Sequence, residues 1–214
     1  MRIFCVVVAA FFLCGKAEAQ RVEFGTYVMT QGDTEVSREH YRFDGTTLAD
    51  TVVFPSRGVR MESIASYDGA FSPVSYVLDL FRGIGAEPVQ RVNVAFDDTA
   101  AVWSTQTELG DSDGVTQLQG SYAFMQNLVF AHLAVVLLKY DHERGGVQNF
   151  DVWMPEQAGT VSMAVEFTTN TEGTVEIVGT VMNVEVDEHG WMRSATVPYQ
   201  NVTVGSVDRT PPRG

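Results

Sequence analysis

An almost uninterrupted apolar stretch lies in the middle of the chain, between Tyr122 and Tyr140. From Leu128 to Leu138, every residue except His132 is apolar. Strands are usually about four to eight residues long, so an apolar run of this length favours a helix over a strand. A helix that is apolar on nearly all sides has to be covered on nearly all sides. We therefore expect a buried helix here, with the rest of the chain folded around it.

The predicted helix carries a thin polar line among its apolar faces. At 100° per residue, His132 and Lys139 project in nearly the same direction. An imidazole in such a helix is either a core histidine with a hydrogen-bond partner or a residue that lines a cavity together with Lys139. The alternative to the helix is a buried strand through Val135 to Leu138. The apolar run is too short to cross a bilayer, which needs about 18 residues or more.

The first nineteen residues are predicted to form a cleaved signal peptide. Arg2 supplies a positive start, residues 3–13 are an apolar core, and Ala17-Glu18-Ala19 has the small-x-small form of a cleavage site. The mature chain is expected to start at Gln20 and to be exported, to the periplasm or outside the cell, without a transmembrane segment.

Both cysteines of the chain, Cys5 and Cys14, lie inside this signal peptide. Acylation at Cys14 would make the protein a lipoprotein, but Phe12 and Leu13 are bulkier than the residues that normally precede an acylated cysteine. Without cysteines the mature chain has no disulfides, so one hydrophobic core has to hold it together.

The chain is strongly acidic, with 14 basic and 27 acidic residues. Without Arg2, Lys16 and Glu18, the mature chain keeps 12 basic and 26 acidic residues. Such a charge repels phosphate backbones and anionic lipid head groups alike, so nucleic acid is not an expected partner.

Outside the apolar stretch, the sequence alternates between apolar and polar residues and is broken by turns. Residues 35–43 and 74–81 are clear alternating strands, and Asp44-Gly45 is a hairpin signal between two such segments. We expect a turn at Gly110 to Gly114, and a β-bulge at Gly179 where the apolar phase shifts by one residue. No sequence repeat is apparent.

About twelve strands follow from this pattern. The fold class is therefore mainly β, with a curved antiparallel sheet, or half-open barrel, around one apolar helix. The expected organisation is a signal peptide at 1–19, a single β-rich domain at 20–207 and a flexible tail at 208–214.

A cleaved signal, a cysteine-free antiparallel meander and an apolar helix together resemble the periplasmic lipoprotein-carrier proteins. The Gly25-Thr26-Tyr27 strand, the Gly32 turn and the strand at 35–43 also resemble secreted bacterial β-domains of unknown function. The carrier resemblance implies a half-open barrel that holds acyl chains under a helix. It rests on architecture alone, so no functional residue is carried over.

Motifs for catalysis are mostly absent. The sequence has no G-x-S-x-G elbow and no glycine-rich nucleotide loop, so we expect neither a cofactor nor a resident metal. The clusters Asp141-His142-Glu143 and Asp187-Glu188-His189 each group a histidine with carboxylates, and together they would suit a divalent metal in a hydrolase. The simpler interpretation of both clusters is a solvated helix end and a solvated turn.

The sequence best fits an exported, non-catalytic β-domain that binds a hydrophobic or amphipathic molecule, such as a lipid, between helix and sheet. The alternative is a fully packed structural or interaction module that docks on an envelope protein, and a metal-dependent hydrolase is the third possibility. The residues expected to line the ligand site are Trp103, Phe130, His132, Leu133, Leu137, Lys139 and Trp153.

Overall fold

The structure is a computed structural model, and it describes residues 22–83, 85, 87–119 and 122–210. The predicted signal peptide, its cleavage site and Cys14 lie outside the described residues. Residues 211–214 of the predicted tail also lie outside them.

The described residues form one fifteen-stranded sheet. Its strands, in chain order, are β1 (Glu23–Gln31), β2 (Thr34–Phe43), β3 (Thr47–Phe54), β4 (Val59–Tyr67), β5 (Pro73–Arg82), β6 (Gln90–Phe96), β7 (Ala100–Thr107), β8 (Gly110–Gln117), β9 (Tyr122–Phe124), β10 (Gln148–Met154), β11 (Gly159–Phe167), β12 (Glu172–Ile177), β13 (Thr180–Val186), β14 (Met192–Val197) and β15 (Val202–Thr210). The helix α1 (Phe130–Leu137) and three short 3-10 helices, η1 (Pro55–Arg57), η2 (Pro155–Gln157) and η3 (Pro198–Gln200), complete the fold.

The sheet is a double meander that starts at its centre. β1 pairs with β2 on one side and with β15 on the other, and each half then continues strand by strand to β8 and to β9. All pairs are antiparallel except β9 with β10. The predicted mainly β fold is confirmed, with fifteen strands in place of about twelve. The extra strands include β9, within the expected helix, and the division of residues 175–186 into β12 and β13.

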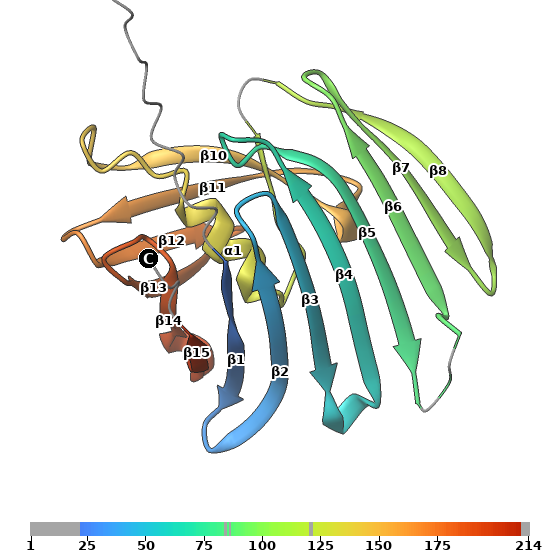
Figure 1. The fold of residues 1–214 in the computed structure, drawn as a ribbon, viewed down its shortest axis with the longest axis horizontal. Helices are drawn as coiled ribbons and strands as arrows, with labels where there is room; N and C mark the ends of the chain where they lie inside the picture. Colours follow the sequence, from blue (N-terminus) through green and yellow to red (C-terminus); the bar gives the residue numbers. More distant parts are fainter. Residues whose placement is uncertain (1–21, 84, 86, 120–121, 211–214) are drawn as a thin grey trace, which may run out of the picture.

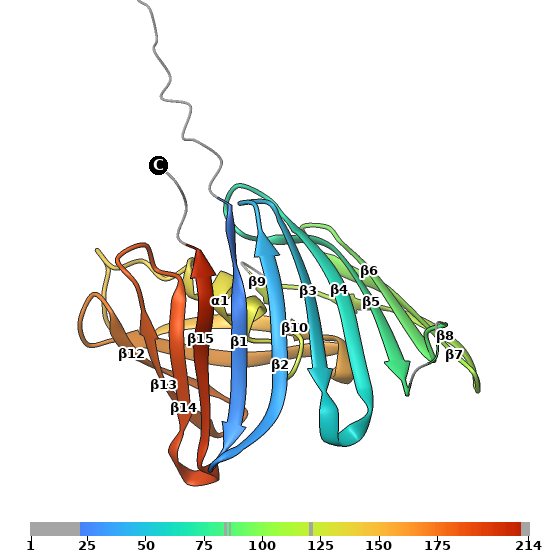
Figure 2. The ribbon, with the colours of Figure 1, turned by 60° about the horizontal axis from the view of Figure 1, so that its bottom comes forward.

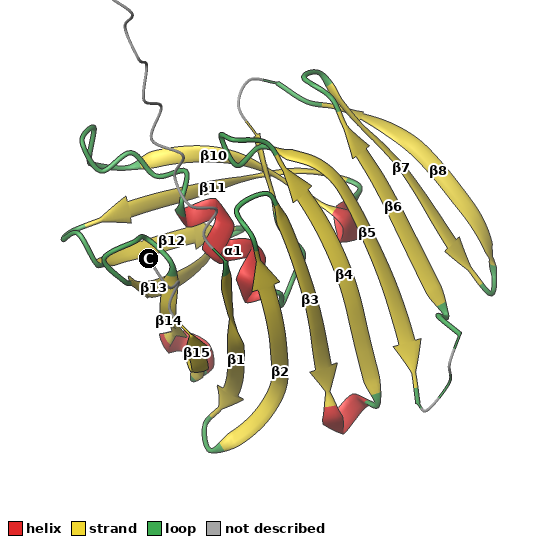
Figure 3. Cartoon of the chain, viewed as in Figure 1, coloured by secondary structure: helices red, strands yellow, loops and turns green. Residues whose placement is uncertain are grey.

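The sheet curls around α1, which lies on its concave side (Figures 1 and 2). All helix residues from Ala131 to Leu137 are buried, as a helix that is apolar on every side requires. Figure 3 shows how little of the chain is helical beside the long strands. No helix within the described ranges is long and apolar enough to cross a membrane.

Side-chain packing connects the two halves of the open sheet, whose edge strands β8 and β9 do not pair with each other. Tyr76 on β5 packs on Phe124 of β9, with ring centroids 4.3 Å apart. Phe96 on β6 makes edge-to-face contacts with Phe124 and with Trp153 of β10. These strands are far apart in the order of the sheet, so an aromatic cluster joins its two halves across the interior.

The helix is shorter than predicted, because residues before Phe130 belong to β9 and to an irregular segment. Leu128 in that segment has a φ of 63°, which interrupts helical geometry. The first turn of α1 also has no local side-chain cap. Its cap comes instead from Glu39 on β2, whose carboxylate accepts hydrogen bonds from the backbone N–H groups of Phe130 and Ala131.

Two predicted turns are also corrected. Val178 and Gly179 both have positive φ and form a two-residue hairpin between β12 and β13, so the phase shift marks a chain reversal and not a bulge. Residues 110–114 belong to strand β8, in which Gly114 pairs with Trp103. A Cβ atom on Gly114 would lie 2.6 Å from the Trp103 ring, so this glycine provides space for the indole.

The last strand extends further than predicted. β15 continues to Thr210, so three residues of the expected tail belong to the sheet. The guanidinium of Arg209 explains this order, since it contacts Glu23 Oε2 at 2.9 Å and Asp187 Oδ2 at 2.6 Å. These ion pairs hold β15 against the start of β1 and the turn after β13.

Candidate functional site

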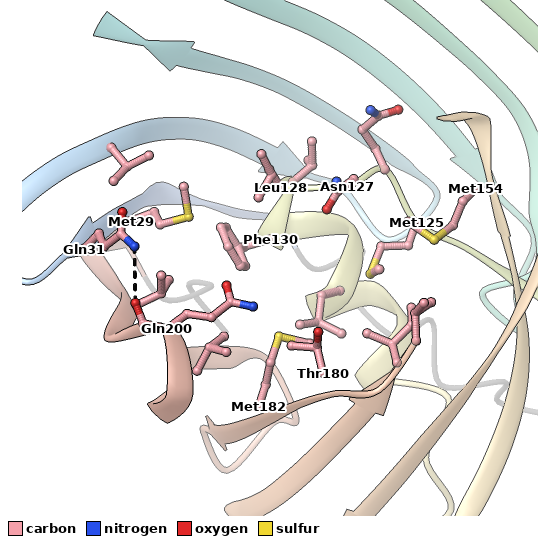
Figure 4. A pocket seen from close by; sticks show the side chains of 18 of the residues that line it. Met29, Gln31, Met125, Asn127, Leu128, Phe130, Met154, Thr180, Met182 and Gln200 are labelled. Carbon is pink, nitrogen blue, oxygen red and sulfur yellow. Dashed lines mark hydrogen bonds between the residues drawn. The ribbon is translucent and has the colours of Figure 1, made fainter. Parts of the chain in front are cut away.

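A cavity of about 530 Å³ lies at the N-terminal end of α1, between the helix and the concave face of the sheet (Figure 4). We call it the main cavity. Its volume falls within the range of about 300 to 1,000 Å³ that is usual for small-molecule sites. Its lining residues are Met29, Gln31, Val36, Arg57, Met125, Gln126, Asn127, Leu128, Val129, Phe130, Leu133, Met154, Gln157, Ile177, Val178, Thr180, Met182, Val197, Gln200 and Val202.

Methionines make up much of the cavity wall. Met29, Met125, Met154 and Met182 come from four separate segments of the chain and face the same space (Figure 4). Methionine is unbranched and polarizable, so it adapts its shape to irregular apolar partners. This wall can therefore pack against apolar molecules of different shapes.

Long polar side chains and one cation complete the lining. Gln31, Asn127, Gln157 and Gln200 are exposed and bring amides to the cavity. The Gln31 amide donates a hydrogen bond to the Gln200 carbonyl oxygen at 3.3 Å. Arg57 is the only charged residue among the lining residues, and none of them is acidic.

A smaller space of about 290 Å³, here called the side cavity, shares part of this lining. Arg57 and residues 126–128 border both spaces. The side cavity has apolar walls from β3 to β6, including Phe54 and Leu78, but Glu156 adds a carboxylate to it. The two cavities thus differ in charge.

Two residues in the main cavity hold unfavourable backbone conformations. Leu128 has a φ of 63° and Val178 a φ of 49°, both uncommon for bulky or β-branched side chains. Such conformations cost about 1 to 3 kcal/mol each and tend to occur at ligand sites. Their position in the cavity supports its candidacy as a functional site.

Behind the main cavity, α1 packs on a buried polar cluster from β2, β3 and β4. His132 Nε2 lies 3.1 Å from Asp50 Oδ2, and Ser63 Oγ donates to the same oxygen at 2.6 Å. Glu39 is close enough for the two carboxylates to interact. Burial, followed by the charge of Asp50, raises the pKa of Glu39 well above its usual value, although the N–H groups of α1 oppose this shift.

This cluster does not have the arrangement of a catalytic triad. In a triad, the histidine lies between serine and aspartate and uses a different ring nitrogen for each. Here Ser63 and His132 both contact one oxygen of Asp50, and His132 Nδ1 has no hydrogen-bond partner among the described residues. All three side chains are buried, so substrate does not reach them. The cluster therefore anchors the helix to the sheet.

The seven residues predicted to line a ligand site are spread over several places. Phe130 and Leu133 line the main cavity. His132 points into the polar cluster and has a hydrogen-bond partner, as expected for a core histidine. Leu137 borders another space of about 400 Å³ at the opposite end of α1, here called the C-terminal cavity.

The other three predicted residues lie outside the main cavity. Lys139 donates hydrogen bonds to Ser72 Oγ and to the Tyr122 carbonyl oxygen, both at 3.2 Å, and burial lowers its pKa. Trp103 on β7 packs over Gly114 of β8, and Trp153 is fully buried in the aromatic cluster.

Residues of the two acidic histidine clusters do approach each other. His142, Asp187, Glu188 and His189 all border the C-terminal cavity. However, the described part of the chain contains no group of three His, Cys, Asp or Glu side chains placed to hold a metal ion. Asp187 is instead engaged with Arg209.

Sequence reasoning missed the methionine wall and the polar residues beside it. The methionines are scattered along strands, and only the curl of the sheet brings them together. The polar residues left a detectable signal, because Arg57, Gln157 and Gln200 each follow, by two positions, a proline that directly succeeds a strand.

Comparisons with known proteins support the fold alone. No family model and no curated protein matches the sequence. A solved structure described as a β-barrel-like protein of domain of unknown function DUF1849, from Brucella abortus, has a TM-score of 0.57 and 12% identity, over 90% of this chain and 98% of that one. A DUF1089 family protein from Pseudomonas aeruginosa has a TM-score of 0.55 and 12% identity, over 75% of this chain and 89% of that one. The chain is thus similar in fold to β-barrel-like domains of unknown function.

Proposed function

We propose that this protein is an exported, non-catalytic β-domain that binds a hydrophobic or amphipathic small molecule, such as a lipid, in the main cavity. The observation that carries the proposal is a space of about 530 Å³ walled by methionine, leucine, valine and phenylalanine side chains. Transfer of each methylene group from water into such a space contributes about 0.8 kcal/mol. A ligand with a moderate alkyl chain would therefore bind without needing many polar contacts.

The shape of the site agrees with a binding role. The aromatic cluster and the polar cluster fill the interior beside and behind α1, whereas the space before its first turn is not filled by side chains. The flexible methionines and the strained Leu128 and Val178 also lie at this space. A ligand would cover apolar surface that the protein itself leaves open.

Binding of a neutral apolar dye, N-phenyl-1-naphthylamine, tests this function. We expect its fluorescence to rise on binding the mature protein, and the Met182→Trp variant to lose most of this binding because the indole fills the cavity. Val102→Trp is the control, since Val102 is half exposed on β7 and does not line the main cavity. If the parent protein binds no dye, or if both variants bind it equally to the parent, the cavity is not the site. The packed interaction module would then be the better hypothesis.

Export is the second part of the proposal and is motivated by Ala17-Glu18-Ala19. Intact-mass measurement of protein recovered from the cell envelope or the medium should show a chain that starts at Gln20. A mass increase equal to a diacylglycerol group on a chain that starts at Cys14 would show a lipoprotein instead.

A further inference from the structure

Three hairpin loops of the barrel share one construction. Each has a proline, any residue, a long polar residue and then a residue in the left-handed conformation. The loops are η1 with Gly58 (φ 58°), η2 with Ala158 (φ 45°) and η3 with Asn201 (φ 51°). In each, the N–H of the left-handed residue donates to the proline carbonyl oxygen, at 3.1 to 3.3 Å.

The curl of the sheet gathers these loops around the main cavity. They join β3 to β4, β10 to β11 and β14 to β15, which are well separated in the order of the sheet. The third residue of each loop nevertheless lines the same space: Arg57, Gln157 and Gln200. The proline and the left-handed residue fix each loop, so they also fix where its polar side chain starts. We call these three residues the polar collar.

The charge of the collar is unusual for this chain. The whole protein has a net charge of −13, yet the lining of the main cavity includes a cation and no carboxylate. Arg38, Arg60, Arg91 and Arg209 all contact carboxylates. Among the described residues no ion pair engages Arg57, and the same holds for Arg42, Arg82, Arg144 and Arg193, but of these five only Arg57 lines the main cavity. Within the part of the chain that the structure describes, the π partner of Arg57 is Phe54, with the guanidinium carbon 5.7 Å from the ring centroid.

From this arrangement we propose that the main cavity selects amphipaths with an anionic oxygen head group, which Arg57 binds at the collar while the alkyl chain enters the methionine-lined wall. The inference rests on the proposed function and adds the class of ligand to it. A guanidinium matches a carboxylate or a phosphate by two parallel hydrogen bonds. The amides of Gln157 and Gln200 add polar groups without adding charge.

The neighbouring side cavity supports the choice of the main cavity for this head group. Arg57 borders both spaces, but only the side cavity has a carboxylate, Glu156, in its lining, and this group would repel an anion there. On the side of the main cavity, the Gln126 amide and the Asn127 N–H lie against Glu156 Oε1 and donate hydrogen bonds to it. An anion that reaches Arg57 from the main cavity meets no carboxylate in the lining.

Displacement of N-phenyl-1-naphthylamine by three ten-carbon compounds tests the inference. Decanoate, decyl phosphate and decanol carry the same chain and differ only in the head group. Below micelle-forming concentrations and at physiological salt, we expect at least one of the two anions to displace the dye at roughly tenfold lower concentration than decanol, as a charge-assisted contact would give. The order of decanoate and decyl phosphate identifies which head group the collar prefers.

Variants at one position assign the preference to Arg57. With each displacing concentration measured relative to the variant's own dye affinity, Arg57→Gln should bring the anions and decanol to similar values, and Arg57→Lys should restore part of the preference. Arg193→Gln, an exposed residue of β14 outside the main cavity, removes the same charge and should leave the preference intact.

The possible failures are distinguishable. Equal displacement by decanol and by both anions in the parent protein overturns the head-group inference and leaves apolar binding in place. A loss of preference in Arg193→Gln as large as that in Arg57→Gln attributes it to net charge and also overturns the inference. Absence of dye binding in the parent overturns the proposed function itself.

Discussion

The carboxylate of Glu39 accepts a hydrogen bond from the backbone N–H of Phe130 at 2.7 Å, across 91 positions of sequence. A second bond, from Ala131 N–H at 2.9 Å, reaches the other carboxylate oxygen. The first N–H groups of a helix have no partner inside the helix, and α1 has no local cap. A buried residue of β2 thus fixes where α1 begins, and with it the inner wall of the main cavity.

The pH dependence of stability should report the burial of this carboxyl group beside Asp50, whose effect on the pKa outweighs that of the helix N–H groups. Burial and the charge of Asp50 raise the pKa of Glu39 above its ordinary value of 4.5. A carboxyl group whose pKa is raised by folding contributes stability that is present below the unfolded pKa and is lost as pH rises through the folded pKa. Glu39→Gln keeps an acceptor for the helix and removes the titration. We expect its free energy of unfolding, measured by urea denaturation, to fall less than that of the parent between about pH 4.5 and pH 8.

Glu39→Ala is the companion variant. It removes the cap altogether and leaves two helix N–H groups without their acceptor, at a cost of about 1 to 3 kcal/mol. If Glu39→Ala were as stable as the parent, the carboxylate would not hold the helix as described. If Glu39→Gln had the same pH profile as the parent, folding would not raise the pKa of Glu39.

His132 and Asp50 should behave as one unit. His132→Leu removes a partner of a buried carboxylate, which we expect to cost about 1 to 3 kcal/mol. The double variant His132→Leu with Asp50→Leu should cost less than the sum of the two single variants, because replacing both partners by apolar groups leaves neither of them buried without the other. Urea denaturation of the four proteins measures this coupling. Additive costs would show that the 3.1 Å contact contributes nothing to stability.

The architecture could be predicted from local patterns, because each strand carries its own alternation and each hairpin its own turn residues. The apolar run after Leu128 likewise indicated a helix that has to be buried on nearly all sides, and Ala131 to Leu137 are all buried. The start of that helix could not be predicted, since its cap is Glu39, on a distant strand. Hairpin and bulge could not be separated at Gly179 either, because both leave the same shift of apolar phase.

The candidate site was harder to predict than the fold. Trp153 and His132 were expected to line the ligand site, but Trp153 is buried in the aromatic cluster and His132 in the polar cluster. The cavity wall is made of methionines that local pattern cannot connect, and of Phe130 and Leu133, which were among the residues expected to line the ligand site. The three proline loops share a short pattern in the sequence, but only the curl of the sheet brings their polar residues to one cavity.

The contact between Gly114 and Trp103 gives a test of strand β8. A methyl group on Gly114 would lie 2.6 Å from the indole, so Gly114→Ala should force the ring or the strand to shift and cost about 1 to 3 kcal/mol. Gly205→Ala is the control, because nothing lies within 4 Å of its added Cβ and its φ is not positive. It should be neutral or slightly stabilising. Thermal unfolding and tryptophan fluorescence measure the effects of Gly114→Ala and Gly205→Ala. Equal melting temperatures of these two variants would argue against the packing of β8 described here.

A comparison of Leu133→Ala with Leu48→Ala tests whether Leu133 lines an open cavity or belongs to a packed core. Both leucines are almost fully buried, with exposed fractions of 2% and 0%, but only Leu133 lines the main cavity. Truncation of a packed leucine costs about 2.7 to 5 kcal/mol, because it combines lost transfer energy with a new cavity. Leu48→Ala should fall in this range. Leu133→Ala should cost about 1 kcal/mol less than Leu48→Ala, because one side of the Leu133 side chain already faces open space.

Dye binding should also distinguish the two variants. Leu133→Ala should bind N-phenyl-1-naphthylamine with altered affinity, whereas Leu48→Ala should bind it as the parent does. An equal or larger loss of stability at Leu133, with unchanged dye binding, would mean that the wall beside α1 is filled in solution, and the packed interaction module would replace the ligand-binding domain.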